Sequence, residues 1–261
     1  MITLPKYHGE TAVFGLGRSG LSVVRALAAA GNRVSAWDQN GDRRAAAEKA
    51  GAEIRDLETA FGAPARLVLS PGVPLTHPQP HAVVKAARAA DVLVLGDVEL
   101  FADAVRNMAE KPKIVAVTGT NGKSTTSALI AHLLATRGAA VRLGGNIGHA
   151  VLDLDMPAQD TQTVYVLELS SYQIDLLETL GPDVAVLTNL SPDHLDRHGD
   201  MPDMSRPNVG FSTCWGPMPP PLSAVTMMKA APLPMLCTLR ARKLAALRPP
   251  PRRISAGAMA R

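Results

Sequence analysis

The chain has 261 residues, of which 46% are hydrophobic and 3% aromatic, and its formal net charge is +4 at pH 7. This length is enough for one or two domains with a sizeable core. The sequence shows no charged segment leading into an apolar run at its start and no apolar stretch of ~18 residues, so it predicts a cytoplasmic protein without a membrane span. Its two cysteines, Cys214 and Cys237, give neither a disulfide framework nor a metal-binding spacing.

The charge is distributed unevenly along the chain. All 23 acidic residues lie at or before Asp203, whereas nine of the 27 Lys and Arg residues follow it. Residues 1–203 therefore carry a net charge of −5, and residues 204–261 carry +9. A basic segment can bind nucleic acid, but the only aromatic residues of this one are Phe211 and Trp215. No nucleic-acid partner is expected.

The first motif is a glycine-rich loop between a predicted strand at 11–14 and a predicted helix at 21–30. The loop reads Gly15-Leu16-Gly17-Arg18-Ser19-Gly20, and a second predicted strand, at 33–37, ends at Asp38. Such glycines permit a tight turn and a close approach of the backbone to a diphosphate, and the acidic residue suits a ribose or a base edge. On these residues alone, an NAD(P)-binding module remains an alternative.

Further strands and helices follow before a polar segment that contains Pro112. The predicted elements are a helix at 42–50, a strand at 66–69 that leads into the turn at 70–74, a strand at 91–96 and a helix at 98–105. We interpret residues 107–113 as a linker. The sequence thus predicts a Rossmann-like α/β domain at 1–106.

A second glycine loop follows the linker and organises the rest of the chain. A buried strand is predicted at 114–117 and a helix at 127–136, with the loop between them. Backbone N–H groups at the helix start would face phosphates, Lys123 would add a positive charge, and the Ser124 hydroxyl could bind Mg²⁺. The predicted ATP-binding residues are Gly119, Thr120, Asn121, Gly122, Lys123, Ser124, Thr125 and Thr126.

Polar residues recur where the later strands are expected to end. Asn146 lies in a glycine-rich turn after a strand at 140–143, and Glu168 lies near the end of an apolar strand at 164–169. A carboxylate inside a parallel sheet is costly unless it is paired or bound to a metal. A strand at 184–189 is followed by a polar, chargeable run at 191–198. We expect His132 and His149 to be structural or solvated.

In this order, the motifs resemble those of the Mur ligase family, most closely the members that add D-glutamate to UDP-N-acetylmuramoyl-L-alanine. The resemblance covers about residues 8–201. It rests on the segments 15–20, 70–72, 96–101, 118–125, 145–148, 167–173 and 189–197. It implies a Rossmann-like domain at 1–106 and a P-loop-type parallel-sheet ATPase domain, incomplete here, at 114–203, with the third, C-terminal ligase domain absent.

The resemblance also implies roles for individual residues. ATP and Mg²⁺ would activate the alanine carboxylate as an acyl phosphate, which the D-glutamate amine attacks, in peptidoglycan precursor synthesis. Lys123, Glu168 and His194 are implied as catalytic, and Ser124, Glu168 and His194 as metal ligands. A monomer is expected. The residues implied for the UDP-sugar are Gly15, Leu16, Gly17, Arg18, Ser19, Asp38, Gly72, Asn146, Ser170 and Gln173.

After Met201 the sequence departs from the family pattern. The family would continue with a Tyr-x-x-Ala-Lys segment whose lysine helps to hold a second Mg²⁺, but this chain has Asn208 at that position. Reading codons for this stretch from the third base of the Met201 codon can restore Ala-Gly-Tyr-Val-Ala-Ala-Lys-Arg-Arg-Ile-Phe. We interpret residues 204–261, which hold ten prolines and six methionines, as a tail that is disordered or out of frame.

Three functions remain open on the sequence. The first is the ligase, inactive in this chain as written. The second is a nucleotide- and UDP-sugar-binding fragment without catalysis. The third is an NAD(P)-binding oxidoreductase, which has less support because no second motif indicates hydride transfer.

Overall fold

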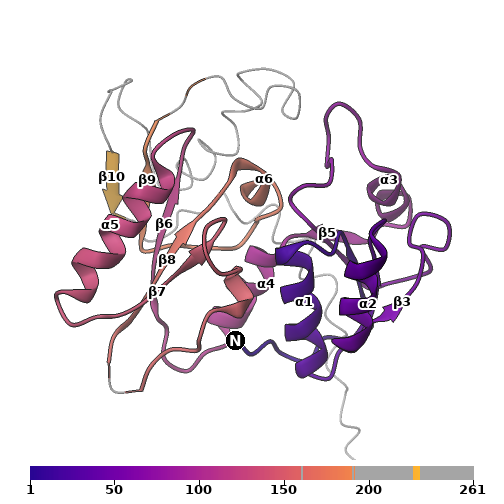
Figure 1. Ribbon diagram of the computed structural model, residues 1–261, viewed down its shortest axis with the longest axis horizontal. Coiled ribbons are helices and arrows are strands. Elements are labelled where there is room, and N and C mark those ends of the chain that lie inside the picture. Colours follow the sequence, from indigo (N-terminus) through magenta and orange to yellow (C-terminus); the bar gives the residue numbers. More distant parts are fainter. Residues whose placement is uncertain (160, 190, 192–225, 230–261) are drawn as a thin grey trace, which may run out of the picture.

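The computed structural model describes residues 1–159, 161–189, 191 and 226–229, and it contains two five-stranded sheets. Figure 1 shows them side by side, one in the indigo and purple half of the chain and one in the magenta and orange half. Their strand orders are β3-β2-β1-β4-β5 and β10-β9-β6-β8-β7, and every neighbouring pair except β10 with β9 is parallel. The predicted α/β class with two parallel sheets is confirmed.

The first sheet and its helices follow the expected order. Its strands are β1 (Glu10–Phe14), β2 (Arg33–Trp37), β3 (Glu53–Ile54), β4 (Arg66–Leu69) and β5 (Leu93–Leu95), and its helices are α1 (Arg18–Ala29), α2 (Gly41–Lys49), α3 (Ala82–Ala89) and α4 (Asp97–Arg106). The sequence did not predict β3 or α3, which are only two and eight residues long. Helix α1 begins three residues before the predicted start, so Arg18 and Ser19 belong to its first turn.

The second sheet carries the other glycine loop. Its elements are β6 (Lys113–Thr118), β7 (Ala140–Gly145), β8 (Thr163–Glu168), β9 (Val184–Leu187), β10 (Thr226–Lys229), α5 (Lys123–Ala135), α6 (Ser171–Ile174) and the 3₁₀ helix η1 (Val151–Asp153). All six residues of β8 are buried, as expected of a central strand in a parallel sheet. Helix α5 begins at Lys123, four residues before the predicted start, which places Lys123 and Ser124 in its first turn.

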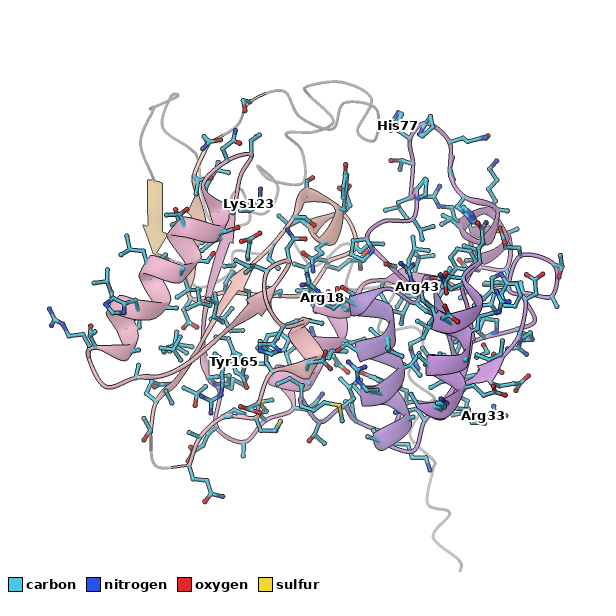
Figure 2. All side chains as sticks on the ribbon, in the orientation of Figure 1. Arg18, Arg33, Arg43, His77, Lys123 and Tyr165 are labelled. Atoms are coloured by element: carbon cyan, nitrogen blue, oxygen red, sulfur yellow. The ribbon has the colours of Figure 1, made fainter. Side chains whose placement is uncertain are left out.

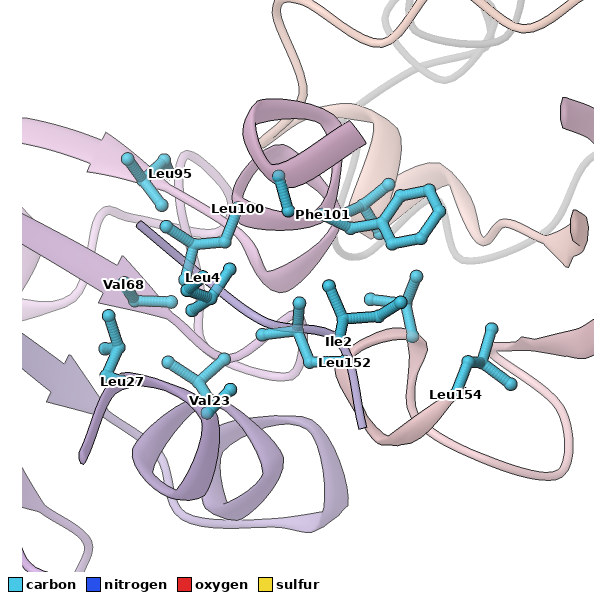
Figure 3. Packing of buried hydrophobic residues seen from close by; sticks show 14 of the residues in the cluster. Ile2, Leu4, Val23, Leu27, Val68, Leu95, Leu100, Phe101, Leu152 and Leu154 are labelled. Atoms are coloured by element: carbon cyan, nitrogen blue, oxygen red, sulfur yellow. The ribbon is translucent and has the colours of Figure 1, made fainter. Parts of the chain in front are cut away.

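One hydrophobic cluster joins the two α/β units. It contains Val23 of α1 and Phe101 of α4 together with Leu152 of η1 and Tyr165 of β8, so both sheets contribute to it. Figure 3 shows the segment that carries Ile2 and Leu4 between helices α1 and α4 of the first unit. Leu152 of the second unit lies next to Ile2. The Ile2 N–H also donates to the Leu152 carbonyl oxygen at 2.9 Å. This shared core fixes the relative position of the two glycine loops.

Four residues of the predicted tail have a defined structure. Thr226–Lys229 pairs antiparallel with β9, from Thr226 opposite Leu187 to Lys229 opposite Val184. The interpretation of 204–261 as disordered or out of frame stays a prediction, and the rest of the tail lies outside the described residues. Among the residues that the structure describes, no helix has the length and apolar character needed to cross a membrane.

Candidate active site

The first glycine loop connects β1 to α1 by a close backbone approach. Gly15 has φ +87°, and its N–H donates to the Trp37 carbonyl oxygen of β2 at 2.9 Å. A Cβ atom on Gly20 would lie 1.9 Å from the Gly15 carbonyl oxygen. The first turn of α1 therefore packs directly on the loop, because the third glycine of the motif has no side chain.

The Asp38 carboxylate holds this loop in place. Its Oδ2 accepts a hydrogen bond from the Leu16 N–H at 2.6 Å and lies 3.4 Å from Nη1 of Arg43, while its Oδ1 accepts from the Asn40 N–H at 2.9 Å. Burial on its own raises the pKa of Asp38, but the Asn40 and Leu16 hydrogen bonds and the Arg43 guanidinium outweigh it and hold the pKa below its usual value. Both carboxylate oxygens thus have partners within the protein.

Three other residues expected to bind the UDP-sugar follow strands of the two sheets. Gly72 is exposed in the turn after β4, and Ser170 and Gln173 form a capping box at the start of α6, just after β8. The Gln173 side chain is 3% exposed, and its Oε1 accepts from the Ser170 N–H at 3.1 Å. The geometry therefore gives Gln173 a capping contact that the sequence motif did not indicate.

Asp97 is a buried carboxyl near Ser19 and Gln173, and sequence reasoning did not single it out as a site residue. It is 2% exposed at the first position of α4, where its Oδ1 accepts from the Val98 N–H at 3.0 Å. Burial raises the pKa of this carboxyl, and the nearby side chains of Ser19 and Gln173 oppose the shift. Asp97 thus lies where the first loop and the start of α6 meet.

The second glycine loop has the form of a phosphate-binding loop. Gly119 has φ +126° and Gly122 has φ +79°, and Gly122 is the N-cap of α5. The Lys123 ammonium donates to the carbonyl oxygens of Gly119 and Thr120, each at 2.8 Å, so its positive charge lies over the loop. Asn121, Gly122 and Ser124 are exposed. A helix N-terminus with exposed N–H groups beside an ammonium group suits a bound polyphosphate.

Residues after β9 fix the shape of this loop, a contribution that the sequence did not predict. The Asn189 carbonyl oxygen accepts from the Thr120 N–H at 2.9 Å, and Asn189 Oδ1 accepts from the Asn121 N–H at 3.0 Å. The Thr188 hydroxyl donates to the Asn121 carbonyl oxygen at 2.7 Å. Because β9 lies next to β6 in the sheet, these residues reach the loop although they are about 68 positions away.

Glu168 ends β8, next to the strand that leads into the phosphate loop. It is 2% exposed, and its Oε1 accepts from Nδ2 of Asn146 at 3.0 Å. Its Oε2 is buried, and no hydrogen-bond partner for it is found among the described residues. A buried carboxylate oxygen without a partner is costly, and a hard cation such as Mg²⁺ would satisfy it. Glu168 therefore fits the predicted metal site.

The part of the chain that the structure describes contains no group of three or more His, Cys, Asp or Glu side chains placed to hold a metal. Mg²⁺ at a nucleotide site takes few protein ligands and is completed by water and phosphate oxygens, so one carboxylate with a nearby hydroxyl suits it. Ser124 carries a hydroxyl at the start of α5, after the strand that pairs with β8. His194, the third expected ligand, lies outside the described residues.

Arg18, in the first glycine loop, reaches across to the second unit. Its Nη1 donates to the Gly148 carbonyl oxygen at 2.9 Å, and its Nη2 donates to the Asn146 carbonyl oxygen at 2.8 Å. Figure 2 shows Arg18 near the boundary between the two halves of the molecule and Lys123 within the second half. The two predicted sites are thus linked through the turn that contains Asn146.

Comparisons with known proteins support the same interpretation. A model of the Mur ligase middle domain matches residues 117–206. The UDP-N-acetylmuramoylalanine–D-glutamate ligase of Caulobacter sp. (strain K31) is 56% identical over 205 residues, and that of Brucella abortus (strain 2308) is 53% identical over 203 residues. Each alignment covers 77% of this chain and 43% of the relative, so the chain spans less than half the length of these curated relatives.

The fold has a counterpart among solved structures. The crystal structure of UDP-N-acetylmuramate:L-alanyl-gamma-D-glutamyl-meso-diaminopimelate ligase from Neisseria meningitides matches with a TM-score of 0.50 and 18% identity, over 79% of this chain and 68% of that one. At this identity the match concerns the fold alone. The chain is therefore a homologue of the UDP-N-acetylmuramoylalanine–D-glutamate ligases, with the N-terminal and middle domains of a Mur ligase.

Proposed function

We propose that this chain binds Mg·ATP at residues 119–126 and UDP-N-acetylmuramoyl-L-alanine along the first glycine loop, as part of a ligase that adds D-glutamate. The observation that carries the proposal is that two complementary groups follow the adjacent, paired strands β6 and β8. Lys123 holds a positive charge over the loop after β6, and Glu168, at the end of β8, has a buried oxygen for which the described part of the chain supplies no hydrogen-bond partner. This pairing suits a nucleotide polyphosphate with its divalent cation.

Each of these groups has a definite task in the proposed reaction. Lys123 would exchange its contacts with loop carbonyls for contacts with phosphate oxygens, and the N–H groups at the start of α5 would orient the phosphates. Glu168 and Ser124 would hold Mg²⁺, and His194 a second ion. Bound Mg²⁺ supplies charge neutralisation at the transferring phosphoryl group. Asn146, fixed on Glu168, would orient the carboxylate of the UDP-sugar substrate.

Asp38 does not by itself separate a UDP-sugar from NAD at the first loop, so the preference for a UDP-sugar rests on the similarity to the D-glutamate ligases. In dinucleotide-binding folds the corresponding acidic residue accepts the ribose hydroxyls. Here its two oxygens already accept from the N–H groups of Leu16 and Asn40, with Arg43 close by. Calorimetric titration with UDP-N-acetylmuramoyl-L-alanine and with NAD⁺ tests the proposal. Tighter binding of NAD⁺ would contradict the proposed UDP-sugar site and favour the NAD(P)-binding alternative.

We expect the sequence after Met201 to prevent catalytic turnover but not the binding of ATP or of the UDP-sugar. Asn208 occupies the position of the family's metal-bridging lysine, so the 261-residue sequence as written is proposed to bind both ligands without completing the reaction. The test compares D-glutamate-dependent phosphate release by this chain with that of a version whose reading frame is restored after Met201 and extended to the length of its relatives. Comparable release from the short chain would contradict this part of the proposal.

A further inference from the structure

Arg18 makes an unusual contact for a residue of a glycine loop. It is the first residue of α1, beside the site proposed for the UDP-sugar, yet both terminal nitrogens of its guanidinium donate to carbonyl oxygens of the other α/β unit. The planar guanidinium matches two neighbouring acceptors in a way that an ammonium group cannot. The acceptors are Gly148 and Asn146, at 2.9 and 2.8 Å. Arg18 therefore clamps one turn, Gly145–Gly148.

That turn lies directly against Glu168. The Asn146 N–H donates to the Glu168 carbonyl oxygen at 2.8 Å, and its Nδ2 donates to Oε1 of the same residue at 3.0 Å. Gly145 has φ +102°, and a Cβ atom there would lie 2.4 Å from the Glu168 carbonyl oxygen. Backbone and side chain of Glu168 are thus both held by the clamped turn. A shift of the turn would move both contacts together.

We propose that Arg18 is a positioning residue for the metal carboxylate. By fixing the carbonyl of Asn146, it fixes the amide that holds Oε1 of Glu168, and this leaves the buried Oε2 aimed at the cation of the nucleotide site. Removal of a group that orients a metal ligand, without binding the metal itself, commonly lowers metal affinity about 10–100-fold. The inference rests on the proposed function, because it needs Glu168 to hold Mg²⁺.

The chain offers a matched control on the same helix. Arg25 lies seven residues after Arg18, on the same face of α1, and also crosses to the second unit, where its Nη2 bonds Asp153 at 2.8 and 2.9 Å. These two hydrogen bonds of Arg25 go to Asp153 and not to the Gly145–Gly148 turn. Arg18→Met and Arg25→Met each remove one arginine contact between the units, but only the first releases Asn146.

The experiment titrates Mg²⁺ into the full 261-residue chain with a fluorescent ATP analogue and no UDP-sugar, so a direct effect of Arg18 on sugar binding cannot enter. We expect Arg18→Met to raise the Mg²⁺ concentration at half-maximal binding about tenfold or more. Arg25→Met is expected to leave it within about twofold, a change too small for a lost metal-orienting group. Equal shifts in both variants, or none in Arg18→Met, would overturn the inference.

Two further variants distinguish a failure of the Arg18 positioning role from a failure of the proposed Mg·ATP site. Arg18→Lys keeps the charge but loses the two-pronged contact, so a shifted Mg²⁺ requirement with an unchanged melting temperature excludes misfolding as the cause. Glu168→Gln tests the metal site itself. If Glu168→Gln raises the Mg²⁺ requirement and both Arg18 variants leave it unchanged, the positioning role is wrong and the proposed function stands. If Glu168→Gln also leaves it unchanged, the proposed metal site is wrong.

Discussion

Oδ2 of Asp38 accepts a hydrogen bond from the backbone N–H of Leu16 at 2.6 Å, which joins the end of β2 to the glycine loop after β1. The same carboxylate also lies against the Asn40 N–H and the Arg43 guanidinium. Three donors converge on a side chain that a dinucleotide-binding protein would turn toward its ligand. Asp38 therefore shapes the loop, and its substitution is expected to act first on stability.

We expect Asp38→Ala to lower the free energy of unfolding by about 1–3 kcal/mol at pH 7, because the Leu16 N–H loses a charged acceptor. The folded-state pKa of Asp38 lies below its usual value, so its contribution is full above the unfolded value of about 3.9 and is lost as the pH falls through the lower, folded value. Urea unfolding of both proteins at neutral and strongly acidic pH measures this. An effect of equal size at both pH values would contradict it.

Gly20→Ala is expected to destabilise the protein although alanine favours helices. The added Cβ would lie 1.9 Å from the Gly15 carbonyl oxygen, a backbone atom that cannot move aside without distorting the loop. We expect a loss of about 1–3 kcal/mol, typical of overpacking. Gly17→Ala, where a Cβ meets nothing within 4 Å, is the control, and thermal melting compares the two. Equal melting temperatures would show that the close approach does not matter.

Lys123→Ala is expected to abolish measurable binding of Mg·ATP and to leave the fold intact. The Lys123 ammonium donates to the carbonyl oxygens of Gly119 and Thr120, and both acceptors lie in its own loop, so its main task is electrostatic. Calorimetry with Mg·ATP measures the loss. Lys113→Ala removes an exposed lysine paired with Asp183 at 2.8 Å and serves as the control. Parent-like ATP binding by Lys123→Ala would refute the phosphate-loop assignment.

Glu99→Ala is expected to weaken the contact between the two units. Glu99 lies on α4, and its carboxylate accepts from the N–H groups of Glu178 and Thr179 at 2.8 and 3.0 Å and from the Thr179 hydroxyl. Without the Glu99 carboxylate these three donors lose their charged acceptor, which we expect to lower the free energy of unfolding by about 2–3 kcal/mol. Thermal unfolding compares it with Glu48→Ala, an exposed position on α2. A melting temperature equal to that of the control would contradict this role.

Local sequence was sufficient for both glycine loops and for most of the strands and helices, but not for β3, α3 or β10. Residues 66–69 form a strand with the predicted bounds, and both glycine loops lie between a strand and a helix as predicted. Such features depend on apolar periodicity and on the backbone freedom of glycine, which neighbouring residues determine. The helix starts were less accurate, because Arg18 and Lys123 lie in polar first turns that carry no apolar pattern.

The partners of the site residues could not be predicted in this way. The motifs and the family resemblance pointed to Asp38, Asn146 and Glu168, but they did not indicate that Asp38 binds its own loop or that Asn146 holds Glu168. The sequence by itself thus determined the two nucleotide-type loops and the order of the strands along the chain. Only the tertiary structure decided which strand ends are neighbours and how Arg18 reaches the second unit, because strand order and the packing of the shared core depend on contacts between residues far apart in the chain.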